Sequence, residues 1–315
     1  MQPGNRVILN TAILYAKMVV SILVGLISTR LVLKALGVED YGIYNVVGGL
    51  VAMFSFLNAT MSGATSRFIT FELGKNSSKV QTVFSVALTI HIIIALIVFL
   101  IGETFGLWFL ENKLTIPATK MYEAKWLLQF SIVTMIFSFT QVPYNASIIA
   151  HEKMNIYAYF ELVNVGLKLL SVYLLLIIDA NKLIFYGAIV MLTQIGVTLL
   201  YRLYCTRKWE HCKFNLSLDR EFLRPLLSYS GWDLFGNASL VARTQGVNVL
   251  LNIFFGAILN AAAGIAMQVQ TAAMSFATNV MTAFRPQIVK TYAAKSYSEM
   301  INLISLGSII TYILY

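Results

Sequence analysis

The chain has 315 residues, of which 58% are hydrophobic and only 12% are charged, with a formal net charge of +9. A soluble domain cannot bury so much apolar surface, so the composition excludes an ordinary water-soluble protein. The two cysteines, Cys205 and Cys212, exclude a disulfide framework and, at their spacing, a metal site.

Long apolar runs follow one another along the chain. A hydrocarbon core of about 30 Å requires roughly 20 residues of helix, and each run reaches or approaches that length. The runs occupy residues 9–33, 42–64, 82–109, 126–149, 156–178, 183–205, 231–255, 261–283 and 301 onward. They predict an all-α fold, a polytopic membrane helix bundle with eight spans and part of a ninth.

The first two runs predict a hairpin with a tight turn at 36–42 and a basic exit at Arg67. A similar pattern returns about 218 residues later, where Arg67 corresponds to Arg285. We therefore predict two pseudo-repeated lobes of six helices. Residues 1–205 form the N-terminal lobe, 206–230 a cytoplasmic amphipathic linker on the membrane surface, and 231–315 the start of a C-terminal lobe. The shift places Tyr315 within the third helix of that lobe, so we expect the second lobe to be incomplete here.

The positive charges predict the orientation. Fourteen of the 23 lysines and arginines lie in the N-terminal tail and the connections on its side, against five in the connections on the other side. Cytoplasmic connections are enriched in lysine and arginine, so the N-terminus is expected in the cytoplasm. The excess of positive charge thus reflects membrane topology, and we expect no nucleic-acid partner.

Three cations lie deep within predicted spans: Lys17, Lys168 and Arg243. Each costs on the order of 2.5–3.5 kcal/mol at a helix centre on insertion scales. At about 100° per residue, polar side chains form a stripe on each of four spans. The predicted cavity lining is Asn10, Ser21, Ser28, Glu161, Asn164, Asn237, Thr244, Asn248, Gln268 and Thr271.

Two interpretations of these stripes remain open: hydrogen bonding between helices in a dry bundle, or a water-filled cationic cavity. Glu161 and Lys168 are two turns apart, about 10 Å of rise, so we do not expect them to pair. The cations are therefore expected to lack acidic partners, which favours the cavity. A cationic cavity suits an anionic cargo such as a phosphorylated group, and amide and hydroxyl side chains suit sugars.

No catalytic, metal or cofactor motif is present, so we expect neither an enzyme nor a bound cofactor. Glu161, Asp233 and His91 are candidates for coupling transport to a proton or ion. A buried structural imidazole is the alternative for His91.

The segment 33–71, with LGVEDYGIY at 36–44 and RFITFELG at 67–74, resembles the polysaccharide-biosynthesis flippases. These proteins move O-antigen, capsule or teichoic-acid lipid intermediates and belong to the multidrug/oligosaccharidyl-lipid/polysaccharide exporter superfamily. The resemblance implies two six-helix lobes around a cavity that opens alternately to each side of the bacterial inner membrane. It also implies an undecaprenyl-pyrophosphate-linked oligosaccharide as substrate for surface polysaccharide synthesis, with membrane lipids and other polysaccharide-assembly proteins as partners.

The resemblance assigns no individual binding residue, so Lys17, Lys168 and Arg243 rest on their depth in the spans alone. A cation-coupled multidrug exporter of the same fold is the first alternative, although span one lacks a carboxylate. A glycan polymerase would need a large external loop, which the sequence does not provide. A non-transporting membrane scaffold is the third alternative.

Overall fold

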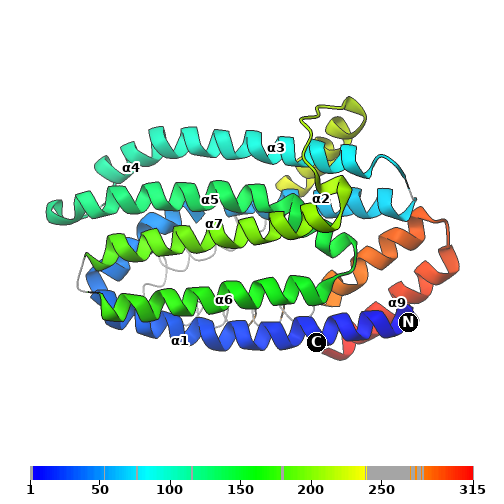
Figure 1. The fold of residues 1–315 in the computed structure, drawn as a ribbon, viewed down its shortest axis with the longest axis horizontal. Coiled ribbons are helices and arrows are strands. Elements are labelled where there is room, and N and C mark those ends of the chain that lie inside the picture. Colours follow the sequence, from blue (N-terminus) through cyan, green and yellow to red (C-terminus); the bar gives the residue numbers. More distant parts are fainter. Residues whose placement is uncertain are drawn as a thin grey trace.

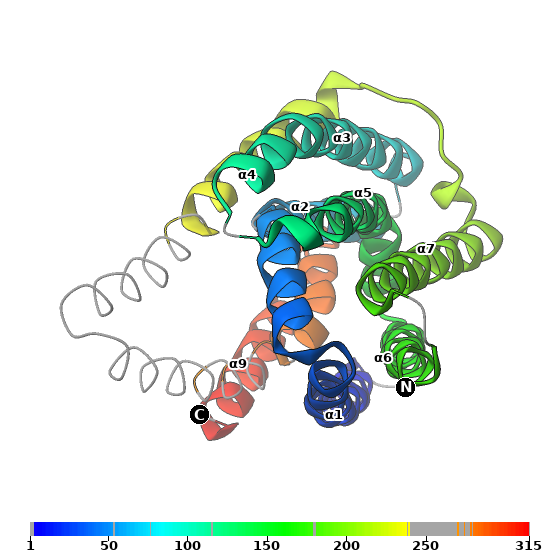
Figure 2. The same ribbon diagram turned by 90° about the vertical axis from the view of Figure 1, so that its left-hand side faces the viewer.

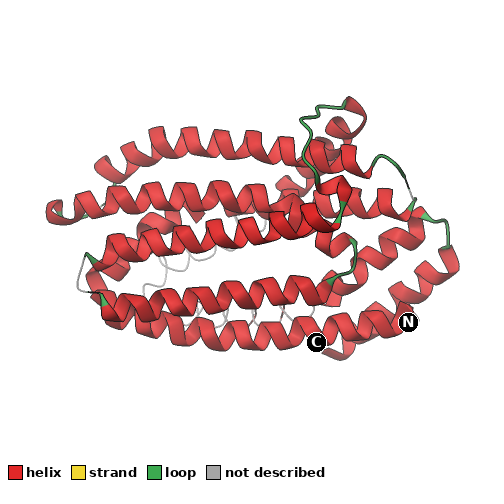
Figure 3. Cartoon of the chain, in the orientation of Figure 1, coloured by secondary structure: helices red, strands yellow, loops and turns green. Residues whose placement is uncertain are grey.

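A computed structural model describes residues 3–52, 54–75, 77–114, 116–178, 181–237 and 280–314, with a few isolated positions between 239 and 278. All regular elements in these residues are helical, and the connections are short loops at the helix ends (Figure 3). The predicted all-α class is therefore confirmed. The helices are α1 (Pro3–Ala52), α2 (Ser55–Gly74), α3 (Val80–Ile101), the π-helical η1 (Gly102–Gly106), α4 (Leu107–Asn112), η2 (Ala118–Lys120), α5 (Met121–Ala150), α6 (Met154–Ile177), α7 (Lys182–Lys208), η3 (Glu210–Cys212) and α9 (Tyr297–Leu314), with further helical residues at 220–237 and 280–293.

The long helices run side by side, and α5 occupies the centre of the first 208 residues (Figures 1 and 2). It packs against α7, α2, α3 and α1, while α1 and α7 both pack against α6. The interior of this group is formed by aliphatic and aromatic side chains such as Phe84, Phe139 and Leu128, none of them exposed. The arrangement leaves α1, α6 and α7 together on one side of α5.

Five helical segments are long and apolar enough to cross a membrane: Ile13–Gly37, Val80–Asn112, Ala118–Ala150, Met154–Ile177 and Lys182–Lys208. Many of their large apolar side chains point outward, among them Leu23, Leu100 and Ile177, which are 57%, 60% and 63% exposed. Such a surface is stable against lipid rather than water. The protein is thus a polytopic membrane helix bundle, as the sequence predicts.

The second predicted span differs from the structure. Residues 42–64 do not form one helix, because α1 continues to Ala52 and α2 begins at Ser55. The predicted turn at 36–42 is a kink in α1, where Gly37 adopts φ 79°. Only glycine adopts this conformation easily, so the bend is located at that residue.

Two helices also extend past their predicted ends. Helix α2 continues beyond Arg67 to Gly74, and helix 280–293 passes through Pro286. The guanidinium of Arg67 lies 4.6 Å from the ring centroid of Tyr229, so this cation is accommodated by an aromatic ring and does not mark a helix end. Helices α3 and α9 begin at Val80 and Tyr297, 217 residues apart, close to the spacing of the predicted repeat.

The connection 206–230 contains a long helix only in its second half. Helix α7 ends at Lys208, η3 covers Glu210–Cys212, residues 213–219 form a loop, and the next helix begins at residue 220 and continues to 237. Phe222 and Leu226 pack into the core beside α3, with exposed fractions of 6% and 0%. Lys79 additionally pairs with Glu221 at 2.7 Å. The linker is therefore attached to the first lobe along one face.

One end of the bundle carries the connections 75–79, 151–153, 209–219 and 294–296, and we call it the basic end (Figure 1). Here the C-terminal part of the chain contacts the N-terminal part. Glu152 accepts hydrogen bonds from Lys290 at 2.8 Å and from Gln287 at 3.0 Å. This is the end that the charge distribution assigns to the cytoplasm.

Candidate functional site

A cavity of about 520 Å³ lies between α1, α6 and α7. Its walls come from two polar faces that the sequence places on separate helices and that the fold turns toward each other. Helix α1 supplies one of these faces, and helix α6 supplies the other, which is centred on Asn164. The predicted residues that line it are Lys17, Ser21, Ser28, Glu161, Asn164 and Lys168.

Lys17 and Glu161 form an ion pair across the cavity. The Nζ atom of Lys17 lies 3.7 Å from Oε2 of Glu161, and the two side chains are 16% and 24% exposed. The Tyr201 hydroxyl donates to Oε1 of the same carboxylate at 3.3 Å, and the Lys17 ammonium lies 4.9 Å from the ring centroid of Tyr157. The expectation that the deep cations lack acidic partners is therefore wrong for Lys17.

Lys168 differs from Lys17. It lines the same cavity, and it makes no ion pair with any residue that the structure describes. Glu161 is seven residues earlier on α6, about 10 Å along the helix axis, and its carboxylate is turned toward α1. With Lys17 and Glu161 offsetting each other, Lys168 gives the described part of the cavity a net positive charge.

Polar atoms in this cavity are left without partners. The hydroxyls of Ser21 and Ser28 and the side-chain oxygen of Asn164 are buried and have no hydrogen-bond partner among the described residues. A buried polar group without a partner costs roughly 1–3 kcal/mol, so each of these three atoms needs a hydrogen-bond partner outside the described residues, such as a water molecule or a polar ligand. The described helices packed as a dry bundle supply none.

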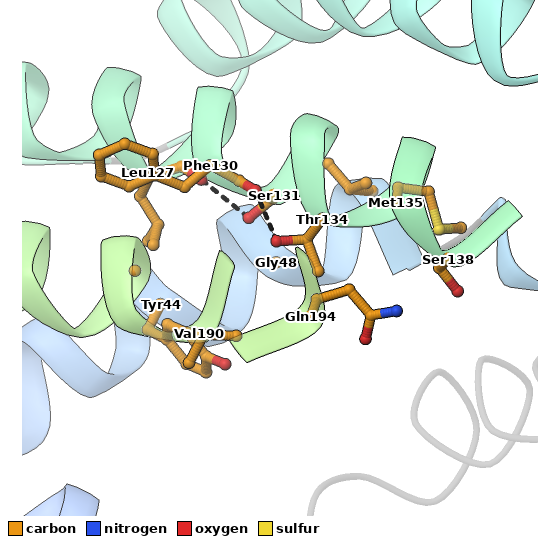
Figure 4. A pocket seen from close by; sticks show the side chains of 12 residues that line it. Tyr44, Gly48, Leu127, Phe130, Ser131, Thr134, Met135, Ser138, Val190 and Gln194 are labelled. Atoms are coloured by element: carbon orange, nitrogen blue, oxygen red, sulfur yellow. Dashed lines mark hydrogen bonds between the residues drawn. The ribbon is translucent and has the colours of Figure 1, made fainter. Parts of the chain in front are cut away.

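A second, smaller pocket of about 230 Å³ adjoins the first and shares Tyr44 and Val190 with it. Helix α5 supplies its polar residues Ser131, Thr134 and Ser138, and α7 supplies Gln194 (Figure 4). The hydroxyls of Ser131 and Thr134 donate to carbonyl oxygens one turn earlier on α5. The lining of this pocket is uncharged and mostly apolar. The polar stripes predicted from the sequence do not include this pocket, although Ser131, Thr134 and Ser138 share one helical face.

The remaining predicted residues lie elsewhere. Asn237 donates to Thr60 at 3.1 Å and to Asp233 at 3.4 Å, so both belong to a contact between α2 and helix 220–237. His91 is fully buried in α3, with Nδ1 2.7 Å from the Ala87 carbonyl oxygen, and it lines neither pocket. Five predicted site residues lie outside the described residues, as does the side chain of Asn10: Arg243, Thr244, Asn248, Gln268 and Thr271.

No group of three or more metal-ligating side chains occurs among the residues that the structure describes. The chemistry available to the cavity is therefore that of one ion pair, one lysine and several hydroxyl and amide groups.

No protein-family profile and no curated protein matches the sequence. Solved structures do match over the whole chain. An outward-facing multidrug-resistance MATE family transporter of the MOP superfamily matches with a TM-score of 0.85 and 13% identity, over 100% of this chain and 70% of that one. The chain has the MATE transporter fold.

Other structures of this fold agree. A MATE protein in its bent conformation matches with a TM-score of 0.84 and 14% identity, over 100% of this chain and 71% of that one. A MOP superfamily transporter from Pyrococcus furiosus matches with a TM-score of 0.82 and 14% identity, over 100% of this chain and 70% of that one. Its binding pocket is described as reversed in polarity and suggestive of a different function. At these identities the comparison establishes the MATE fold and leaves the cargo open.

Proposed function

We propose that the protein exports an anionic lipid-linked oligosaccharide across a membrane by alternating access. Lys168 is the observation that carries the proposal, because it has no acidic partner among the described residues and lines a cavity whose polar atoms are also unpaired within that part of the chain. An unpaired cation at membrane depth is expensive unless it meets water or a negatively charged ligand. The expected substrate is an undecaprenyl-pyrophosphate-linked glycan for surface polysaccharide.

In this proposal, Lys168 attracts the pyrophosphate as a point charge. Glu161, the acidic member of the Lys17–Glu161 pair, lies about two helical turns away on the same helix. Ser21, Ser28 and Asn164 offer hydrogen bonds to sugar hydroxyls. The lipid tail of such a substrate remains in the bilayer, against the exposed apolar faces of the helices. Arg243 remains a proposed third cation of the site.

The proposed setting is the bacterial inner membrane, with the basic end and the N-terminus in the cytoplasm. In this setting the cavity receives its cargo on the cytoplasmic side and releases it on the other. Membrane lipids and other polysaccharide-assembly proteins are the proposed partners.

A multidrug exporter of the same fold is the second candidate, and Glu161 is the observation that favours it. A carboxylate in the cavity can bind a cationic drug or a coupling ion once Lys17 moves away. The volume of about 520 Å³ also falls within the range of about 300–1,000 Å³ that is typical of small-molecule sites. A structural neighbour is a multidrug-resistance transporter, whereas another is described as having a pocket of reversed polarity.

A complementation experiment distinguishes the candidates. The full-length protein and its Lys168→Gln variant are expressed in cells lacking the chromosomal copy, and surface polysaccharide, drug susceptibility and protein level are measured. The glycan proposal expects loss of surface polysaccharide with Lys168→Gln at unchanged protein level and unchanged drug susceptibility. Lys34→Gln is the matched control, because Lys34 is exposed on α1 and does not line the cavity.

The other outcomes reject the proposal. Normal polysaccharide in the Lys168→Gln variant excludes this site for the glycan, and drug hypersensitivity with normal polysaccharide supports the multidrug exporter. If neither the deletion nor the cavity variants change either readout, the protein is a membrane scaffold.

A further inference from the structure

A groove of about 370 Å³ opens between α6 and α7 near the basic end, on a different face of α7 from the transport cavity. Leu200 and Leu203 are 40% and 50% exposed in this groove, whereas Tyr201 between them is fully buried and donates to Glu161 on the cavity side. The groove is lined by Phe160, Leu200, Leu203, Tyr204, Arg207 and Lys208.

The groove is apolar along its length and positive at its end. Leu200, Leu203 and Arg207 occupy positions three and seven residues apart, so they share one face of α7. From Leu200 to Arg207 the helix rises about 10 Å, less than half of a hydrocarbon core of about 30 Å. Because Arg207 and Lys208 end the membrane-length helix Lys182–Lys208, we expect the groove to lie within one leaflet, with its cations at the level of the headgroups.

The two cations are available to a ligand. Neither Arg207 nor Lys208 makes an ion pair within the described residues, whereas Lys213 nearby pairs with Glu210 at 3.5 Å. Cations in the last turn of a helix are also stabilised by the helix dipole. The dipole does not explain why an apolar groove should end beside them, so a ligand with both an anionic and an apolar part fits the arrangement better.

We propose that this groove binds an anionic phospholipid of the leaflet at the basic end. The phosphate lies against Arg207 and Lys208, and the upper part of an acyl chain lies along Leu200, Leu203 and Phe160. Basic pockets between membrane helices are suited to such headgroups, because the phosphate gains charge-assisted hydrogen bonds while the chain stays in an apolar environment.

The lipid is distinct from the transported cargo. Phe160 forms the floor of the groove, and its ring lies 4.8 Å from that of Tyr201. This aromatic layer separates the groove from Glu161 and the transport cavity. The groove therefore holds a resident lipid whose site is independent of the proposed transport function.

The test uses the purified, delipidated full-length protein and native mass spectrometry. Bound lipids are counted during titration with phosphatidylglycerol, with phosphatidylcholine as the neutral lipid and with inorganic phosphate alone. The wild-type protein is expected to bind phosphatidylglycerol more tightly than either of the others. The double variant Arg207→Gln/Lys208→Gln is expected to lose about 30-fold in affinity. This loss corresponds to about 1 kcal/mol for each cation removed, at about 1.4 kcal/mol per tenfold change.

The matched control is Arg220→Gln/Arg224→Gln, which removes the same charge from exposed positions at the same end of the bundle but outside the groove. It should change the affinity less than twofold, whereas an equal loss in both double variants would mean nonspecific charge attraction and reject the site. Leu203→Trp fills the groove and keeps both cations, so it must also weaken lipid binding. Unchanged binding in Leu203→Trp, or equal binding of the two lipids by the wild type, overturns the proposal.

Discussion

The ammonium of Lys17 lies 3.7 Å from the carboxylate of Glu161, and this ion pair joins α1 to α6 across the proposed transport cavity. Both side chains are largely buried, and Tyr201 adds a hydrogen bond to the carboxylate. A partly buried charge depends on its partner, because water reaches it poorly. The pair therefore holds α1 against α6 while it is intact.

Lys17→Ala should destabilise the protein by roughly 1–3 kcal/mol, because it leaves the Glu161 carboxylate with Tyr201 as its hydrogen-bond partner. The double variant Lys17→Ala/Glu161→Gln should lose less than the sum of the two single variants, since the amide no longer needs a cation. Thermal unfolding of the four proteins in detergent measures this coupling. Lys34→Ala on the same helix should stay within about 0.5 kcal/mol, and strictly additive losses would contradict the pair.

Gly37→Ala should destabilise the protein by about 1–3 kcal/mol. The residue has φ 79° and ψ 172°, a region that side chains with a Cβ rarely occupy. The cost comes from backbone strain, because no described atom lies within 4 Å of an added Cβ at this position. Gly166→Ala is the control, since its Cβ also meets no atom of the described residues and its φ is not positive. Equal unfolding temperatures for the two variants would show that the kink does not depend on glycine.

Periodicity along single helices predicted much of the cavity. The polar stripes on 9–33 and 156–178 turned out to face each other, so Lys17, Ser21, Asn164 and Lys168 line one space. The contact between Lys17 and Glu161 could not be predicted in the same way. Helical arithmetic tests pairs on one helix, whereas this pair depends on how α1 packs against α6.

Helix ends were harder to predict than helix faces. Arg67 suggested the end of a span, yet α2 continues for seven more residues because Tyr229 accommodates the guanidinium. Hydropathy gives the apolar run, but it cannot show which aromatic ring lies beside a cation at the membrane surface. The pocket at Ser131, Thr134 and Ser138 was missed for a related reason: without a charge, its polar positions looked like ordinary contacts between helices.

Acidification should destabilise the packing at the basic end, because it protonates His151. Its ring stacks on two neighbouring rings, with centroids 4.1 Å from Trp209 and 5.1 Å from His211. Burial lowers the pKa of His151 to about 4, from an ordinary value of 6.5, and the nearby His211, Lys290 and Lys153 act in the same direction. The unfolded chain therefore binds more protons than the folded one between these two values, so the contribution present above pH 6.5 is lost as the pH falls toward 4.

The measurement is the unfolding temperature of the wild type and of His151→Phe between pH 7.5 and pH 4. Phenylalanine preserves the stacked ring and cannot titrate, so the variant should show a shallower decline on acidification. All other titrating groups are common to both proteins. Parallel curves would show that His151 does not carry the effect.

Gly74→Val should separate the two parts of the chain at the basic end. A Cβ at Gly74 would lie 2.9 Å from Cα of Lys290 and 2.9 Å from Cβ of Ala293, so α2 and helix 280–293 pack too closely for a side chain. Overpacking of this kind typically costs 1–3 kcal/mol, here at the contact that Glu152 and Lys290 also maintain. Hydrogen exchange should therefore accelerate in residues 280–293 and remain unchanged in α7. Gly166→Val serves as the control, because no atom in the described part of the chain lies within 4 Å of a Cβ there. Unchanged exchange at 280–293 in Gly74→Val would mean that this close approach does not hold the basic end together.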